Sequence, residues 1–271
     1  MNFSTVYVDG DILLYEVAFA TQKNIYHIYV EGIEVWIGSD KRLINKIFKD
    51  IDYEYEKYTY VQPLLSAINT YKTRLKTYAK LFGTTNIEVV LTGPTNFRDE
   101  VAISRPYKGT RTQDKPYNYP ELKVYMIEEG AIVTENEEAD DYLSYMTYNK
   151  YNTVNVTIDK DAYNTPSYIY NTNKGELTHV SEEDATKNFW TQVLTGDSVD
   201  NIPGLPNCGK VGAHVLLDEL KTYQECEREV GMAYAVHPAI DDPEAYLTEQ
   251  AILLWMRREP EEVWRIGYGL L

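Results

Sequence analysis

Short apolar runs alternate with amphipathic segments along the first half of the chain. Residues 5–8 and 87–91 have the composition of buried strands, and residues 64–82 between them carry apolar side chains at helical spacing. Gly83 follows directly, at the position where a glycine commonly ends a helix. A strand, a helical connection and a second strand imply parallel pairing, so the pattern predicts an α/β fold with a parallel sheet flanked by helices.

Further elements follow from the same pattern. A hairpin centred on a Glu-Gly pair is predicted for residues 25–37, whereas residues 40–60 are charged, rich in tyrosine and without a clear period. Strands are also predicted at residues 130–133 and 154–158. The sheet therefore continues into the second half of the chain.

From Ser181 onward the pattern becomes helical. Residues 216–226 and 244–258 have apolar positions typical of amphipathic helices. We therefore expect two regions, an α/β domain over residues 1–180 and a helical region over residues 181–271.

The composition limits the location and the partners of the protein. The apolar runs fall well short of the roughly 18 residues that a membrane span needs, and a strand pattern beginning by Val6 leaves no room for a signal peptide. We therefore expect a soluble, cytoplasmic protein without a membrane partner.

Cys208 and Cys226 are the only cysteines, so neither zinc nor a disulfide framework is indicated. With 26 Lys and Arg against 42 Asp and Glu, the charge of −16 argues against broad affinity for nucleic acid, unless many acids surround bound cations.

Four clusters of acids mark places where predicted strands end or helices begin. In an open α/β sheet such positions converge on one site. Turn formation or helix capping explains a single cluster equally well, but a strand ending in Asp-Lys-Asp places carboxylates that repel unless a cation or a proton lies between them. The acids are Asp9 and Asp11; Glu138, Asp140 and Asp141; Asp159 and Asp161; and Asp197 and Asp200.

Residues 97–123 form the most basic window of this acidic chain. Prolines break the window into short pieces. A solvated surface loop would have this composition, and so would a gateway whose cations meet a phosphate backbone. The cations are Arg98, Arg105, Lys108, Arg111, Lys115 and Lys123.

The stretch TGDSVDNIPGLPNCGKVGA, residues 195–213, combines two features. Asp197 and Asp200 are three residues apart, so a helical turn would project both from one face, where they could hold a hard cation. The glycines after them permit tight turns, and Lys210 adds positive charge where a helix is expected to begin. A glycine-rich loop between helices is also common without any ligand. The glycines are Gly204, Gly209 and Gly212.

Taken in order, these motifs resemble those of the flap endonuclease and 5′→3′ exonuclease family, and its bacteriophage and bacterial branch fits best. The resemblance covers residues 5 to about 220. It implies a PIN-like nuclease domain, a gateway near residues 97–125 and a helix-three-turn-helix that grips duplex DNA. The motifs are VDGD at 8–11, FR at 97–98, YKGTR at 107–111, EADD at 138–141, TIDKDA at 157–162 and the stretch 195–213.

The resemblance also implies roles for single residues. Lys108 and Arg111 match the family's gateway cations, and Tyr107 beside them is a candidate surface for stacking an unpaired base. The loop after Asp200 matches the duplex-binding loop, which in the family also holds a monovalent cation such as K⁺ through backbone carbonyls. The residues expected to contact DNA are Arg105, Gly204, Gly209, Lys210 and Gly212. The residues expected to hold two Mg²⁺ ions, with Mn²⁺ as a substitute, are Asp9, Glu138, Asp140, Asp141, Asp159, Asp161, Asp197 and Asp200.

One acid of the family is absent. The family places a carboxylate shortly before FR, whereas residues 91–96, LTGPTN, contain none. We take Gly93 as the equivalent position and expect Gly93→Asp to tighten metal binding if the backbone accommodates it. Asp11 is a candidate replacement, whereas Asp99 lies past the arginine and is a poor one.

These expectations define a function, the two-metal hydrolysis of DNA phosphodiesters near 5′ ends or flaps. RNA in RNA–DNA hybrids is a further candidate substrate, and replication proteins are candidate partners that the sequence does not specify. Two alternatives stay open: a PIN-type ribonuclease, because acids alone do not distinguish DNA from RNA, and a weakened nuclease that mainly binds branched DNA, because one acid is missing. A kinase or ATPase is disfavoured, since no GxxxxGK[ST] motif occurs.

Overall fold

The structure is a computed structural model that describes residues 2–110 and 114–267. It divides into two compact units, and the expected boundary at residue 180 is not one of the divisions, because residues on both sides of it belong to the same unit. The larger unit comprises Met1–Ile12, Thr77–Gln113 and Gly130–Leu271. The smaller unit comprises Leu13–Lys76 and Asp114–Glu129.

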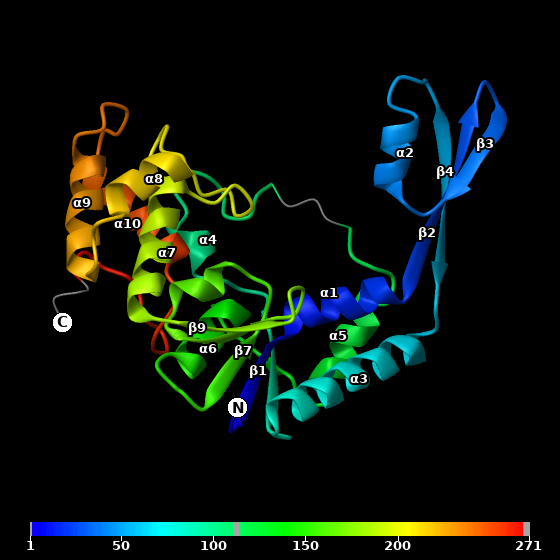
Figure 1. The fold of residues 1–271 in the computed structure, drawn as a ribbon, viewed down its shortest axis with the longest axis horizontal. Helices are drawn as coiled ribbons and strands as arrows, with labels where there is room; N and C mark the ends of the chain where they lie inside the picture. The colour runs from blue at the N-terminus through cyan, green and yellow to red at the C-terminus, as the bar shows by residue number, and fades with distance from the viewer. Residues whose placement is uncertain (1, 111–113, 268–271) are drawn as a thin grey trace. The chain divides into compact units, whose positions relative to one another are not determined.

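A six-stranded sheet forms the centre of the larger unit, in the order β6-β5-β1-β7-β8-β9 (Figure 1). Neighbouring strands pair in parallel except β8 and β9, which form an antiparallel hairpin at one edge. The predicted α/β fold with a mainly parallel sheet is confirmed, and the hairpin is an addition. The strands are β1 (Thr5–Asp9), β5 (Ile87–Leu91), β6 (Ile132–Val133), β7 (Thr153–Val156), β8 (Ser167–Asn171) and β9 (Glu176–Val180).

The strand order brings the carboxyl ends of β1, β5 and β7 together. Asp9 at the end of β1 lies opposite Val90, and Val8 lies opposite Val156. Every residue of β1 and β7 is buried, as is typical of central parallel strands that are covered on both faces. Side chains that follow these strands therefore meet at one edge of the sheet.

Helices cover the sheet and continue into a helical region with its own apolar core. Figure 1 shows α6 beside β1 and β7, and α7, α8, α9 and α10 grouped together. In that group Trp190 is fully buried, and the hydroxyl of Tyr234 donates to the Val193 carbonyl at 2.6 Å. The helices are α4 (Arg98–Val101), α6 (Ala139–Thr147), a 3₁₀ turn at Asp161–Asn164, α7 (Glu182–Thr195), α8 (Lys210–Leu217), α9 (Tyr223–Ala235) and α10 (Pro243–Leu254).

The helix predicted over residues 216–226 is wrong, because α8 ends at Leu217 and α9 begins at Tyr223. Thr222 caps α9: its hydroxyl accepts from the Glu225 amide, and the Glu225 carboxylate accepts from the Thr222 amide. This reciprocal capping box starts a new helix at Tyr223, inside the segment that was predicted as one helix.

One fully buried ion pair joins three parts of the larger unit. Arg98 in α4 donates to both carboxylate oxygens of Asp141 in α6, at 2.5 and 2.9 Å. The same guanidinium donates to the carbonyl of Leu253, at 3.0 Å, and to that of Trp255, at 2.7 Å. Because both side chains are 0% exposed, neither charge has water to replace its partner.

We expect Arg98→Met to lower the free energy of unfolding by about 3–5 kcal/mol, because the Asp141 carboxylate would remain buried without a counter-charge. Urea denaturation measures this loss. The double variant Arg98→Met/Asp141→Leu should recover much of it, because the unpaired charge is gone. A single variant as stable as the wild type would contradict this role of the pair.

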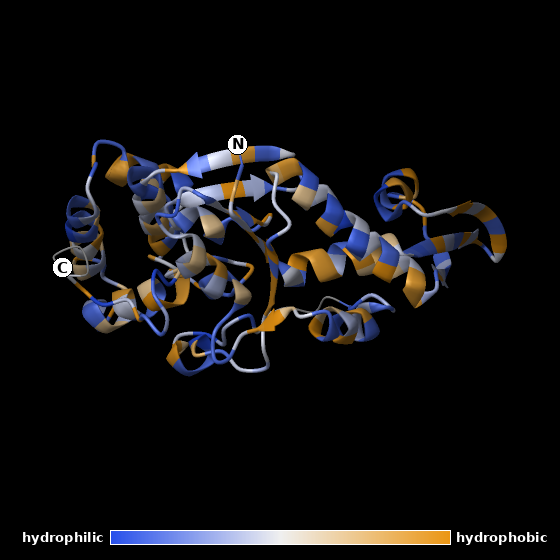
Figure 2. Cartoon of the chain, turned by 90° about the horizontal axis from the view of Figure 1, so that it is seen from below, coloured by the Kyte–Doolittle hydropathy of each residue, from blue (hydrophilic) through white to orange (hydrophobic). Residues whose placement is uncertain are grey.

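The smaller unit contains a three-stranded antiparallel sheet in the order β3-β2-β4. The hairpin predicted over residues 25–37 is confirmed as β2 and β3, with Glu31 and Gly32 at positive φ in the turn. Figure 2 shows hydrophobic and hydrophilic positions alternating along this sheet. Its strands are β2 (Gln22–Val30), β3 (Ile33–Gly38) and β4 (Glu54–Val61).

Residues 40–60, for which no structure was predicted, supply β4 and a helix that covers one face of this sheet. Ile44 and Phe48 pack there against Tyr26 and Ile28. The predicted helix over residues 64–82 is confirmed. The helices are α1 (Gly10–Ala20), α2 (Lys41–Ile47), α3 (Leu64–Phe82) and α5 (Tyr119–Glu128), of which α1 begins and α3 ends in the larger unit. Among the helices of the described residues, none has the length and apolar character needed to cross a membrane.

Candidate active site

The first group of acids consists of Asp9, Asp140 and Asp159, with Glu138 beside them. Asp9 lies at its centre. Its Oδ1 accepts from the Ile12 amide at 3.0 Å, so Asp9 caps α1, and its Oδ2 accepts from the Thr157 hydroxyl at 2.9 Å. Burial, reinforced by the charges of Asp11 and Asp159, raises the pKa of Asp9 to about 7. The capping interpretation and the site interpretation are therefore compatible, because the same carboxylate caps the helix and lies beside other acids.

Asp140, in the first turn of α6, belongs to the same group. Burial raises its pKa well above the usual value, and the charges of Asp9, Asp159 and Glu138 raise it further. Within the described part of the chain, Oδ1 of Asp140 is buried and has no hydrogen-bond partner. An unsatisfied carboxylate oxygen among other acids is the arrangement that a bound cation satisfies.

The second group consists of Asp161, Asp197 and Asp200, each of which offers a carboxylate oxygen within 4.8 Å of the others. Burial, and next the charge of Asp159, raises the pKa of Asp161 to about 7. The expectation that Asp197 and Asp200 share a helical turn is wrong. They lie in a tight turn after α7, in which the backbones of Asp197 and Ile202 pair as an antiparallel bridge.

The loop that follows α4 in the basic window, here called the basic loop and described over residues 102–110, reaches both acid groups through Tyr107 and Lys108. The Tyr107 hydroxyl lies 3.1 Å from Glu138 Oε2 and 3.1 Å from Asp200 Oδ2. Lys108 forms an ion pair with Glu138, its Nζ lies 3.9 Å from Asp200 Oδ2, and its amide donates to the Asp200 carbonyl at 3.0 Å. Arg111, the other predicted gateway cation, lies outside the described residues.

Tyr107 has surroundings that differ from those of a stacking surface. Its ring packs against the helical core, and burial, followed by the charge of Glu138, raises its pKa well above the usual value. The phenol is therefore protonated and acts as a donor that links the two acid groups.

The glycine-rich loop depends on close backbone contact. Gly204 has φ of 67°, and a Cβ there would lie 2.3 Å from the Gly196 amide nitrogen, so only glycine fits. Gly209 precedes α8 and Lys210 begins it, while Gly212 lies within the first turn of that helix. Arg105, at the start of the basic loop, is exposed.

A pocket of about 530 Å³ connects the second acid group with the amide end of α8. The Nζ of Lys160, on its lining, lies 2.7 Å from Asp197 Oδ2. Gly209 and Lys210 line the same pocket. A phosphate group entering there would meet a helix N-terminus and a lysine close to the acids.

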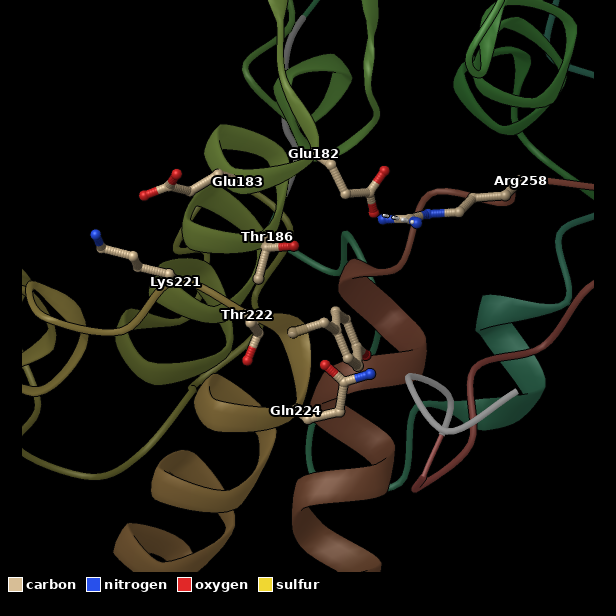
Figure 3. Close-up of a pocket in the computed structure, with 8 residues that line it drawn as sticks. Glu182, Glu183, Thr186, Lys221, Thr222, Gln224 and Arg258 are labelled. Carbon is tan, nitrogen blue, oxygen red and sulfur yellow. Dashed lines mark hydrogen bonds and ion pairs between the residues drawn. The ribbon is translucent and has the colours of Figure 1, made fainter.

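A second pocket, of about 490 Å³, lies between the N-terminal ends of α7 and α9 (Figure 3). Arg258, from the segment after α10, reaches it and forms an ion pair with Glu182 at 2.7 Å. None of the predicted site residues lines this pocket. Its size alone therefore does not mark it as a catalytic site.

No protein-family model matches the chain, and no curated protein does. Solved structures do. A bacteriophage T5 protein co-crystallised with metal ions superposes with a TM-score of 0.53 at 13% identity, over 93% of this chain and 88% of that one. The bacteriophage T5 flap endonuclease in a pseudo-enzyme–product complex with DNA and metal ions gives 0.54 at 14%, over 93% and 86%. A mutant T5 5′-exonuclease gives 0.51 at 13%, over 93% and 85%.

The chain has the fold of the T5 flap endonuclease. At such low identity the superposition establishes the fold alone. Seven of the eight predicted ligands lie in the two acid groups or beside them. They are Asp9, Glu138, Asp140, Asp159, Asp161, Asp197 and Asp200.

Asp141 is the one predicted ligand whose carboxylate points away from the acid groups and binds Arg98. Both of its oxygens are bound by Arg98, away from solvent. We therefore assign Asp141 to the scaffold and leave it out of the ligand set.

The position of the absent acid also needs correction. Gly93 does not have positive φ, but a Cβ there would lie 2.0 Å from the Thr134 carbonyl oxygen, so no side chain fits without movement of the backbone. The side chain that reaches the start of α6 is that of Thr92, whose hydroxyl accepts from the Ala139 amide at 2.9 Å. Asp11 lies at the same strand end, where its Oδ2 accepts from the Thr92 amide at 3.0 Å.

Several residues that hold the acids were not singled out from the sequence. Gln192, which is 31 positions from Asp161 in the sequence, donates to its carboxylate at 2.5 Å. Asn96 donates to Glu138 at 2.9 Å. Thr157 and Lys160 belong to the TIDKDA motif, so their proximity in sequence to Asp159 and Asp161 could have identified them. No local pattern marks Gln192 or Asn96, because these contacts depend on the tertiary fold.

We expect Gly93→Asp to lower the free energy of unfolding by about 1–3 kcal/mol and to leave Mg²⁺ affinity no tighter, because its Cβ overlaps the Thr134 carbonyl. Thr92→Asp is the matched variant, since an Asp oxygen can still accept from the Ala139 amide while adding a carboxylate. Thermal melts and Mg²⁺ titration compare the two. A stable Gly93→Asp protein that binds Mg²⁺ more tightly than Thr92→Asp would contradict the corrected position.

The buried acids predict how stability depends on pH when metal is removed by a chelator. The pKa of Asp9 and that of Asp161 rise from 3.8 to about 7 on folding, so the folded state binds more protons than the unfolded state between these values. The free energy of unfolding should therefore fall as the pH rises from about 4 to about 7. Melting temperatures at pH 5 and pH 8 test this fall, which should be smaller in Asp9→Asn and reversed by Mg²⁺ at pH 8. A wild-type protein that gains stability over this range would contradict it.

Proposed function

We propose that the protein is a divalent-metal-dependent nuclease that cleaves DNA near 5′ ends or flaps, as a 5′→3′ exonuclease and flap endonuclease. The observation that carries the proposal is the pair of buried acid groups joined by Tyr107 and Lys108 at the carboxyl edge of the sheet. The shared fold supports it, since the T5 flap endonuclease has been crystallised with DNA and metal ions.

We infer that the acids hold two hard cations. Asp9, Asp140 and Asp159 would hold one, with Glu138 beside them, and Asp161, Asp197 and Asp200 would hold the other. Their donor set is oxygen alone, which suits Mg²⁺ or Mn²⁺. When bound, the ions would supply an activated water and would stabilise charge on the attacking and leaving oxygens of the phosphodiester. The unsatisfied Oδ1 of Asp140 and the raised pKa values support this assignment independently of the fold.

The basic loop would act on the same phosphate. Lys108 lies between the two acid groups, where its ammonium can stabilise the negative charge that develops on a phosphate oxygen. Tyr107 keeps Glu138 and Asp200 at a fixed separation through its hydroxyl. Its interactions favour this holding role over base stacking.

The loop from Asn201 to Ala213 would bind the duplex arm of the substrate. The amide end of α8, Lys210 and the pocket that leads to Asp197 together provide a local phosphate site in a protein of net charge −16. Such contacts position DNA without reading its sequence. The carbonyls of this loop remain the candidate ligands for K⁺.

We expect the purified protein to cut a 5′-labelled DNA flap when Mg²⁺ is added, and Asp161→Asn to lose cleavage by a factor of about 10³ or more while it still binds the flap. Gel analysis of the products and fluorescence anisotropy measure the two properties. Matched RNA and DNA flaps separate the alternatives. Cleavage of RNA alone would favour a ribonuclease, and tight binding of DNA without cleavage would favour a branched-DNA-binding protein.

We expect Lys210→Ala to weaken binding of flaps that carry a duplex arm about equally for all sequences, and to reduce the slope of log affinity against log salt by about 1. Lys221→Ala is the matched control, because Lys221 is also exposed but lines the pocket of Figure 3 instead. Anisotropy titrations at several salt concentrations measure both variants. Equal losses in the two would mean that the effect is only one of net charge.

A further inference from the structure

Helix α10 presents polar side chains on one face to two loops of the candidate site. Tyr246, Glu249 and Gln250 have the spacing that places side chains on one side of a helix. Glu249 and Gln250 are buried, which is unusual for these residue types without polar partners. Figure 1 shows α10 close to α4 and α7, the helices from which these loops emerge.

Glu249 binds the beginning of the basic loop. Its Oε1 accepts from the amides of Ile103 and Ser104, at 2.7 and 2.6 Å, and its Oε2 accepts from the Ser104 hydroxyl at 2.5 Å. Hydrogen bonds to an ionised carboxylate are stronger than those between neutral groups. One side chain thereby fixes two consecutive peptide units a few residues before Lys108.

A second point of the same loop, at Pro106 and Lys108, is held by the turn that carries Asp200. The Lys108 amide donates to the Asp200 carbonyl, and Asn201 Nδ2 donates to the Pro106 carbonyl at 2.9 Å. Lys108 has φ of 52°, a conformation that a residue other than glycine rarely adopts. The loop is therefore held at two points, and the second of them includes the strained residue Lys108.

The neighbouring side chains of α10 hold the glycine-rich loop in a similar way. Gln250 Oε1 accepts from the Gly204 amide at 3.0 Å, and the Tyr246 hydroxyl donates to the Gly204 carbonyl at 3.1 Å. The same helix thus contacts the loop that carries Lys108 and the loop proposed to bind the duplex.

We propose that Glu249 is a positioning residue that sets the place of Lys108 between the two acid groups. The inference rests on the proposed function for its effect on catalysis, although the positioning itself is a property of the fold. Glu249 acts through the backbone of Ile103 and Ser104 and touches neither the acids nor a substrate. Its loss should lower the rate of the chemical step and leave the loop of Gly204 and Lys210, and hence duplex binding, unchanged.

Three variants separate positioning from general stability. Glu249→Met keeps the length of the side chain but removes its acceptors. Glu249→Gln retains an oxygen for the two amides and can donate to the Ser104 hydroxyl, so it should rescue function. Glu244→Met is the matched control, because Glu244 is exposed on the same helix.

Loss of Glu249 should loosen the loop without unfolding the protein. Ile103 is 87% exposed, so water can solvate the freed amides. Melting temperatures of the three variants provide the check. They should stay close together, so that differences in rate reflect the position of the loop.

Two measurements test the proposal. Single-turnover cleavage of a DNA flap at saturating Mg²⁺ should be about 10- to 100-fold slower in Glu249→Met, with the dissociation constant of the flap within about twofold of wild type, because a catalytic group displaced by about 1 Å loses that much rate. Hydrogen exchange followed by mass spectrometry should show faster exchange of the Lys108 and Gly109 amides in the same variant. Glu249→Gln and Glu244→Met should match the wild type in both.

The outcomes distinguish this inference from the proposed function. An active wild type with unchanged rate and unchanged exchange in Glu249→Met would overturn the positioning role. Equal losses of rate and of affinity would also overturn it, because they indicate a general structural defect. If the wild type cleaves no nucleic acid, the proposed function fails, and exchange at Lys108 and Gly109 still decides whether Glu249 positions the loop.

Discussion

Crowding of negative charge is the constraint on which the site depends. Asp9 is buried and Asp140, Asp159 and Asp161 are partly buried beside it, and burial and mutual repulsion raise the pKa of Asp9, Asp140 and Asp161. Such an arrangement opposes folding unless protons, cations or hydrogen-bond donors compensate. The edge of the sheet that gathers these acids therefore depends on cations, protons or hydrogen-bond donors for its stability.

The chain supplies part of this compensation from its own side chains. Thr157 donates to Asp9, Gln192 to Asp161 and Asn96 to Glu138, while Lys160 and Lys108 bring positive charge to each acid group. Neutral donors orient a carboxylate without cancelling its charge, so the oxygens stay available for a metal. The lysines reach the acids from loops, where a cation can displace them more readily than it could displace a buried arginine.

Arg98 illustrates the opposite use of the same chemistry. Its ion pair with Asp141 is fully buried and is completed by two backbone carbonyls, so the charge is committed to the scaffold. Asp140 and Asp141 are adjacent in sequence, yet one lies among the acids with an unsatisfied oxygen and the other has its oxygens occupied. A helix turns by about 100° per residue, so neighbouring side chains point to different surroundings.

Features that depend on residues close together in the sequence could be predicted, whereas features that depend on tertiary contacts could not. The strands that end at Asp9 and before Asp159, the helix over residues 64–82 and the hairpin around Glu31 and Gly32 depend on short-range periodicity and turn chemistry, which the sequence carries directly. The order of acids along parallel strands also predicted their meeting at one edge, because strand direction alone places carboxyl ends together.

Other features were decided only when the chain folded. At the end of β5 the side chain that reaches the start of α6 is that of Thr92, because the Thr134 carbonyl fills the space beside Gly93. Asp141 is not available as a ligand, because Arg98, 43 positions away, binds both of its oxygens. Likewise, Glu249 meets the basic loop across 145 positions of sequence. The sequence by itself determined the central strands, the helix over residues 64–82 and the acids that follow the strands, because these depend on neighbours along the chain. The tertiary structure decided which carboxylates share a site and which are held elsewhere, because burial, repulsion and hydrogen bonding act between residues that only the fold brings together.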